Sequence, residues 1–95
     1  MKVQLDFLGL PQLAKIIGTA QKLEFVGSTI EDLIVHLIKR YGAGVEDILV
    51  DDGKKLNPYI LVMVNEELIT ARDDREQVQL AEGDSIIFAV IAEGG

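Results

Sequence analysis

The sequence predicts an α+β domain in which one main helix packs on one face of a mixed, four- to five-stranded sheet. Three observations predict this class. Residues 3–7 and 22–26 alternate apolar and polar side chains, residues 30–41 carry one continuous apolar stripe, and further β-prone segments follow in the second half of the chain. One long amphipathic helix can cover one face of a sheet, and the result is a domain of two layers.

The first three elements are predicted from short local patterns. Residues 3–7 alternate with period two, as a strand with one buried face does. Residues 11–17 can form a short helical turn, because Pro11 is tolerated in a first turn and Gly18 can close it. Residues 22–26 alternate again and stop at Gly27, which predicts a second strand that forms a hairpin with the first.

The main helix has both a start signal and a stop signal. Ser28 with Glu31 forms a capping-box pattern, and Thr29 with Asp32 offers a second candidate one residue later. Gly42 is placed to end the helix. The side chains between them recur at the three- and four-residue spacing that forms one apolar stripe: Ile30, Leu33, Ile34, Leu37, Ile38 and Tyr41.

The second half of the chain completes the sheet. Residues 45–50 are ambiguous, and residues 51–58 read as a loop excursion that contains an Asp-Asp-Gly turn. Residues 59–64 are a continuous β-prone run, which suits a strand that is buried on both faces or that faces a helix. A turn at 65–67, brief pairing at 68–69, alternation at 78–80 and a last strand at 85–91 follow, and we expect the first and last strands to be neighbours.

This order of elements is that of the ubiquitin-like β-grasp fold. The predicted division is a β-grasp domain over residues 1–91 and a flexible Gly-Gly tail over residues 92–95.

Composition excludes several classes of function. The chain has 95 residues, no cysteine and a net charge of −7, and twelve of its sixteen acidic residues lie in residues 46–95. Phosphate contacts need clustered Lys and Arg, so we expect no nucleic-acid partner, whereas a basic protein surface would be attracted. The longest apolar run, residues 86–92, is too short to span a membrane, and no export signal is visible. A cytoplasmic protein without a membrane partner is expected.

The interior offers no catalytic constellation. His36 is the only histidine and falls on the polar side of the helix, so it reads as a surface residue, and neither a metal site nor a Ser-His-Asp relay is expected. The acid pairs at 51–52 and 73–74 adjoin loop residues and bases, which favours solvated turns over general acid–base chemistry. The spacing Gly42-x-Gly44 lacks the rest of a phosphate-binding fingerprint. We therefore expect that this protein is not itself an enzyme.

The end of the chain carries the strongest signal. The apolar last strand runs into Ala92-Glu93-Gly94-Gly95 and stops. Glycine has no Cβ, so Gly94 and Gly95 can thread a narrow channel that would exclude a side chain. The four residues reach at most about 13–14 Å when extended. A terminal carboxylate, with a pKa near 3.5 in model compounds, is ionised at neutral pH and can act as a nucleophile.

The element order, the pattern Leu80-x-x-Gly83-Asp84-x-Ile86-x-Phe88 and the terminal Gly94-Gly95 together resemble the ubiquitin-like sulfur-carrier family. That family includes the small subunit of molybdopterin synthase and the thiamine-biosynthesis sulfur carrier. The resemblance covers nearly the whole chain. Two positions depart from the pattern: Glu66 stands where many relatives have Gly, and residues 88–91 lack the proline common in molybdopterin-synthase small subunits.

The resemblance implies a carrier that binds no cofactor itself. An adenylating, ATP-dependent activating enzyme would adenylate Gly95, and a sulfur donor would displace AMP to leave a C-terminal thiocarboxylate. The sulfur would then pass to an acceptor enzyme, with the large subunit of molybdopterin synthase as the favoured partner. Ala92, Glu93 and Gly94 would form the arm that presents Gly95.

Other functions stay open at this stage. A thiamine-pathway carrier would have the same fold and tail, and so would a ubiquitin-like modifier whose Gly95 is joined to a lysine of another protein. A passive β-grasp interaction module, in which an acidic face binds a basic partner, would not need the terminal glycines at all.

Overall fold

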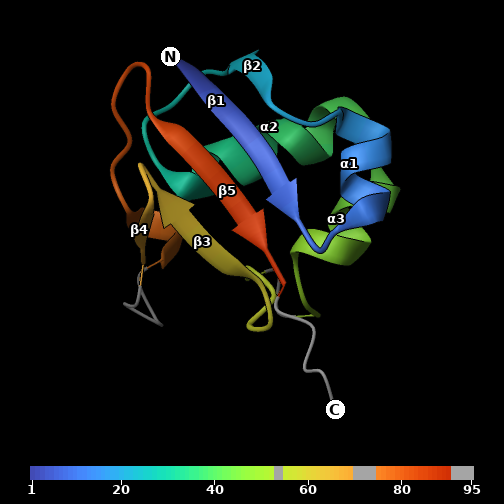
Figure 1. The fold of residues 1–95 in the computed structure, drawn as a ribbon. Helices are drawn as coiled ribbons and strands as arrows, with labels where there is room; N and C mark the ends of the chain where they lie inside the picture. Colours follow the sequence, from blue (N-terminus) through green and yellow to red (C-terminus); the bar gives the residue numbers. More distant parts are fainter. Residues whose placement is uncertain (53–54, 70–74, 91–95) are drawn as a thin grey trace.

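The computed structural model describes residues 1–52, 55–69 and 75–90. The predicted α+β class is confirmed: strands and helices build a single sheet with helices against it (Figure 1). In chain order the elements are β1 (Lys2–Leu8), α1 (Pro11–Ile17), β2 (Gln21–Glu24), α2 (Ile30–Tyr41), α3 (Ala43–Leu49), β3 (Leu61–Val64), β4 (Glu67–Leu68), the 3₁₀ turn η1 (Arg75–Gln77) and β5 (Ser85–Ala89).

The sheet is mixed, and its strand order is β2-β1-β5-β3-β4. β1 pairs antiparallel with β2 and parallel with β5, so the first and last strands are neighbours as predicted. β5 pairs antiparallel with β3 on its other side. Figure 1 shows α2 lying across one face of this sheet, while the other face carries no helix among the described residues.

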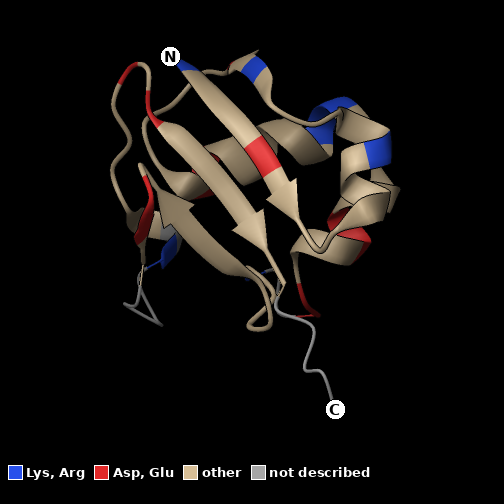
Figure 2. Cartoon of the chain, viewed as in Figure 1, with Lys and Arg blue, Asp and Glu red and all other residues tan. Residues whose placement is uncertain are grey.

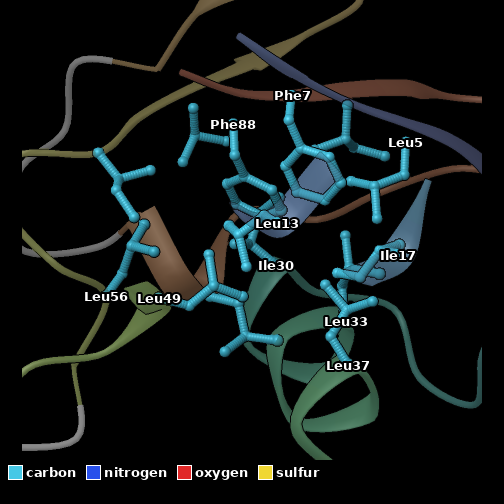
Figure 3. Packing of buried hydrophobic residues seen from close by; sticks show 14 of the residues in the cluster. Leu5, Phe7, Leu13, Ile17, Ile30, Leu33, Leu37, Leu49, Leu56 and Phe88 are labelled. Carbon is cyan, nitrogen blue, oxygen red and sulfur yellow. The ribbon is translucent and has the colours of Figure 1, made fainter. Parts of the chain in front are cut away.

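The hydrophobic core lies between the sheet and α2. Phe7 of β1 and Phe88 of β5 point toward the helix with their ring centroids 6.2 Å apart, which is within the range of favourable stacked aromatic pairs (Figure 3). The predicted stripe of α2 meets them, and its four fully or nearly buried members are Ile30, Leu33, Ile34 and Leu37. Ile38 and Tyr41 are only partly buried at the end of the stripe.

The start of α2 follows the second of the two predicted capping candidates. The hydroxyl of Thr29 accepts from the backbone N–H of Asp32 at 3.1 Å, and the Asp32 carboxylate accepts from the N–H of Thr29 at 3.2 Å. The other predicted capping box, which pairs Ser28 with Glu31, is wrong. Ser28 instead donates its own N–H to the Asp32 carboxylate at 2.9 Å, which places it one residue before the cap.

Hydrogen bonding to its carboxylate, chiefly by the backbone N–H of Ser28 and next by the side chain of Thr29, lowers the pKa of Asp32 below its ordinary value of 3.8. A carboxyl with a lowered folded-state pKa stabilises the fold above its unfolded pKa and loses that contribution as the pH falls through the folded pKa. We expect Asp32→Asn to reduce the free energy of unfolding at pH 7 and to cost much less near pH 2–3. Urea unfolding at the two pH values measures this. Glu31→Gln, which removes a charge from the same turn outside the capping box, should lack this pH dependence, and an equal Asp32→Asn cost at both pH values would contradict the interpretation.

Three segments differ from the sequence-based expectations. The ambiguous residues 45–50 contribute to α3, which buries Val45 and Leu49 one helical turn apart. The strand expected at 59–64 begins only at Leu61, because Pro58 and Tyr59 form a turn that the N–H of Ile60 closes onto the carbonyl of Asn57 at 3.0 Å. Residues 78–80 form an isolated bridge to Thr29 instead of a strand of the sheet.

The remaining strands end slightly earlier than expected. β2 stops at Glu24, so Val26 lies outside the sheet and is 95% exposed. β5 stops at Ala89, and residue 91 of the expected strand lies outside the described residues. In β3, Val62 is buried against the helix layer whereas Leu61 and Met63 are half-buried on the open face, so this strand faces a helix on one side only.

The turn between β3 and β4 takes a left-handed conformation at both central residues, with φ of 53° at Asn65 and 70° at Glu66. Such two-residue hairpin turns favour Asn-Gly, because a side chain at positive φ costs about 1–2 kcal/mol. We therefore expect Glu66→Gly to raise the free energy of unfolding by about 0.5–1 kcal/mol. Chemical denaturation checks this, and a destabilised variant would contradict it.

Candidate functional site

The predicted site residues Ala92, Glu93, Gly94 and Gly95 lie outside the described residues. The described chain leads to them through β5, which pairs with β1 from Ser85 to Ala89 and with β3 from Ile86 to Ala89. Just after the strand, the backbone N–H of Val90 donates to the carbonyl of Leu8 at 2.9 Å. The base of the tail is therefore anchored in the middle of the sheet, at the end where β1 also finishes.

The backbone of Gly9 lies close to the backbone of Val90 at this same point. Its φ is +69°, and a Cβ added to it would lie 2.4 Å from the carbonyl oxygen of Val90. That distance is far inside van der Waals contact, and backbone atoms on both sides leave little room for adjustment. Gly9 thus lets β1 turn away while Val90 stays in register beside it.

We expect Gly9→Ala to destabilise the protein by more than the roughly 1–2 kcal/mol that a left-handed alanine alone costs, since the new methyl group also displaces Val90. Gly83→Ala is the matched control, because Gly83 has a φ of +86° and open space where a Cβ would be. Urea unfolding of the two variants separates the two effects. Equal destabilisation would show that the approach of Gly9 to Val90 carries no extra cost.

An apolar patch covers the open face of the sheet beside this point. We call it the exit patch, and its side chains are half-buried or exposed: Leu8, Leu61, Met63, Leu68 and Ile87. The strand register places Leu8, Ala89 and Leu61 in one row across three strands, and Ile87, Met63 and Leu68 in the next. With Leu8 51% and Leu68 45% exposed, apolar side chains remain in contact with water around the strand that leads to Gly95.

Asp6 places one acid at the border of the exit patch, directly opposite Ile87 in the register (Figure 2). Its carboxylate accepts the backbone N–H groups of Phe7 at 2.8 Å and Ala20 at 3.2 Å. Asp6 therefore ties the turn before β2 to β1. This structural role accounts for an acid in an otherwise apolar row.

The other residues considered from the sequence do not converge on this site. His36 is half-buried beside Phe25, with ring centroids 6.3 Å apart, so the expected plain surface histidine in fact packs against an aromatic ring. Asp51 accepts the N–H of Lys55 at 3.2 Å in the predicted turn, whereas Asp73 and Asp74 lie outside the described residues. Within residues 1–52, 55–69 and 75–90, no group of His, Cys, Asp and Glu side chains could hold a metal ion.

None of the helices described is long and apolar enough to cross a membrane.

Comparison with models of protein families assigns the chain to one family. The model of the ThiS family matches residues 12–95, which includes the terminal glycines. The chain belongs to the ThiS family. This membership confirms the predicted relationship to ubiquitin-like sulfur carriers and agrees with the β-grasp arrangement described above. A comparison with curated proteins finds no match.

Solved structures share the fold of this ThiS-family chain over almost its full length. Urm1 from Trypanosoma brucei is 30% identical with a TM-score of 0.72, covering 99% of this chain and 95% of that one. The Amycolatopsis orientalis BexX/CysO complex contains a chain that is 26% identical with a TM-score of 0.73, covering 98% of this chain and 99% of that one. SAMP1 from Haloferax volcanii is 20% identical with a TM-score of 0.73 and full coverage of both chains, a likeness that shows the fold alone.

The role of the tail stays a prediction from the sequence, and sequence reasoning missed the exit patch and Gly9. A signal for the patch was present, because Leu61, Met63 and Ile87 occupy alternate positions within strands that read as continuously apolar. When the residues on both faces of a strand are apolar, the sequence shows one continuous apolar run, and the apolar outer face cannot be told from the buried inner face. Nothing in the neighbouring residues could have shown that Gly9 meets Val90.

Proposed function

We propose that this protein is a sulfur carrier whose C-terminal Gly95 is adenylated and then converted to a thiocarboxylate. Membership of the ThiS family through the last residue carries the proposal. The anchored base of the tail and the exit patch around it support the proposal, since a partner could bind the folded body while it acts on the terminus.

The proposed chemistry needs only the terminal carboxylate from this chain. A carboxylate oxygen of Gly95 attacks the α-phosphorus of ATP bound by an activating enzyme, which forms an acyl adenylate and releases pyrophosphate. A donor that carries sulfur at the oxidation level of sulfide then attacks the acyl carbon and forms the C–S bond. The bond between the acyl carbon and AMP breaks, and AMP leaves with its electron pair. The carrier contributes position, because holding the acyl group in a partner's site turns the reaction into an effectively unimolecular step.

The exit patch gives the activating enzyme an apolar surface to dock on. An exposed apolar patch rimmed by polar residues is typical of a protein-interaction surface. Leu8 and Leu61 lie in the sheet row that also contains Ala89, one residue before the described chain reaches Val90. An enzyme bound there would meet the tail at its base. The solved BexX/CysO complex is a case in which a structurally similar chain is found with a partner protein.

For the acceptor, we propose the large subunit of molybdopterin synthase, which places the protein in molybdenum or tungsten cofactor biosynthesis. The loop excursion at residues 51–58 favours this branch, and the lack of proline in residues 88–91 weighs against it. A thiamine-pathway carrier is the alternative branch. Transfer of sulfur from the charged protein to each purified acceptor enzyme, followed by detection of the sulfur-containing product, distinguishes the two.

A second candidate is a protein modifier, in which a lysine amine attacks the same acyl adenylate in place of sulfur. The solved structures of small archaeal modifier protein 1 from Haloferax volcanii and Methanosarcina acetivorans share this fold at 19% identity, so they support the shape and not the reaction. The two reactions leave different products: a free thiocarboxylate, or an isopeptide bond between Gly95 and lysine.

Intact-mass analysis tests the proposal. The protein is incubated with an adenylating enzyme of the family, ATP and sulfide, and its mass should increase by the exchange of one oxygen for one sulfur at the C-terminus. Omission of ATP should abolish the change. An unchanged mass under conditions that charge a control carrier would reject the sulfur-carrier function, and recovery of Gly95 on lysines of other proteins would favour the modifier.

A further inference from the structure

Strand β2 forms one edge of the sheet and pairs only with β1 within the described part of the chain. Just beyond the strand, Met1 and Phe25 exchange two hydrogen bonds: the terminal ammonium donates to the Phe25 carbonyl, and the Phe25 N–H donates to the Met1 carbonyl, both at 2.9 Å. Hydrogen-bonded and non-hydrogen-bonded pairs alternate along an antiparallel ladder. Lys22 and Glu24, at the alternate positions, therefore direct their backbone N–H and C=O groups away from β1.

A groove runs between this free edge and α2. It consists of two adjoining hollows of about 310 and 760 Å³, which share Glu24 and His36. β2 and the segment 25–27 that follows it form one wall, and residues of α2 form the other. Met1, Leu5 and Ile17 complete the lining. A chain that paired with the edge of β2 would thus lie beside α2, with alternate side chains directed into the groove.

The two hollows differ in chemistry. The smaller one is lined by Lys22 and Arg40, in a protein whose net charge is −7. The larger one presents Val26, which is 95% exposed, and Val35, which is 43% exposed. Figure 2 shows basic residues on β2 and on the C-terminal part of α2, whereas α3 carries acids.

The remaining charged groups of the groove are consistent with this division. Two positive charges lie in the larger hollow: Lys39 of α2 and the terminal ammonium of Met1, which donates to the Phe25 carbonyl. Asp32 also lines it, but its carboxylate is engaged by the N–H groups of Ser28 and Thr29 in the helix cap. Glu24 lies between the two hollows and would repel an acid placed directly opposite it. Acids of a bound chain are therefore expected chiefly at the end of the groove that holds Lys22 and Arg40.

We infer that this groove is a docking site for an extended peptide segment of a partner protein, which adds to β2 as a further strand. The segment pairs with the free backbone groups of Lys22 and Glu24, places acidic side chains beside Lys22 and Arg40, and places apolar side chains beside Val26 and Val35. Strand addition of this kind draws its affinity from main-chain hydrogen bonds and its selectivity from the alternate side chains. The site is two strands away from β5, so the inference does not depend on the function proposed for Gly95.

Synthetic peptides test the inference. The ¹⁵N-labelled full chain is titrated with acetylated, amidated Val-Ile-Val-Ile-Asp-Glu-Asp and with the reversed sequence, because the direction of the added strand is open. One of the two should shift the amide signals of β2 and the facing side of α2, and should slow hydrogen exchange at Lys22 and Glu24. A version with proline in the apolar run should bind at least about tenfold more weakly, since it cannot complete the ladder.

Charge reversal tests the basic end. Arg40→Glu and Lys22→Glu should each weaken binding by roughly five- to tenfold at low salt, whereas Lys15→Glu on α1 removes the same charge outside the groove and should change little. The inference is overturned if neither peptide binds, if the shifts map to the exit patch, or if the proline peptide binds equally well. It is also overturned if sedimentation shows that β2 pairs with β2 of a second copy.

Discussion

Deletion of Gly95 is expected to abolish charging of the protein by its activating enzyme. Removal of one residue moves the terminal carboxylate by up to about 3.3–3.6 Å along an extended chain. A misplacement of about 1 Å can cost 100-fold in rate, so we expect a loss of more than about 100-fold in thiocarboxylate formation. One extra residue after Gly95 should have a similar effect. Intact-mass analysis over a time course measures both variants.

The control for this prediction keeps the tail and changes a glycine elsewhere. Gly83→Ala leaves residues 84–95 as they are and should be charged at nearly the normal rate, provided that it is folded. If the chain without Gly95 were charged as fast as the unaltered protein, or if it retained full biological function, the passive interaction module would become the better description.

The double variant Leu8→Asp, Leu68→Asp is expected to lower kcat/KM for charging by at least about 30-fold, mainly through a higher KM. Both side chains are about half exposed at the rim of the exit patch, so two carboxylates there remain hydrated in the free protein. A partner that covers the patch would have to desolvate them, which costs on the order of 1–3 kcal/mol per unpaired group. Steady-state kinetics at varied carrier concentration provides the measurement.

Ile16→Asp is the matched control for the patch. Ile16 is 42% exposed and lies on α1, away from the open face of the sheet, so the substitution has the same polarity change at similar exposure. It should leave KM nearly unchanged. Equal effects of the control and the double variant, or an altered unfolding midpoint that accounts for the loss, would remove the exit patch from the docking surface.

Local signals explain which parts of the fold could be predicted. The main helix was placed correctly because its start, its stop and its apolar stripe all lie within residues 28–42 and depend on neighbours in sequence. α3 was missed because only two of its seven residues are buried, which is too few to define a period. The Thr29 and Ser28 capping candidates differ by a single residue, and only the packing of α2 against the sheet chose between them.

The candidate site also has one part that the sequence could suggest and one part that it could not. The carboxylate of Gly95 stays a prediction, and it was proposed from the sequence because the Gly-Gly pattern and the family resemblance can be read from the residues alone. The exit patch was not, because its members Leu8 and Leu68 are sixty residues apart in sequence. They come to the same face only through the register of four strands. That register is fixed by which side chains each strand buries, and a shift of one residue would turn the patch into the core.

The sequence by itself therefore determined the α+β class and the order of the main elements, since periodicity and caps are local properties. Only the tertiary structure decided that Val90 leaves the sheet between β1 and β3, that Gly9 must lack a side chain beside it, and that β2 keeps a free edge along a basic and apolar groove. Each of these depends on contacts between segments distant in sequence. Such contacts form because burial of one face of every strand selects one arrangement among the many that local preferences allow.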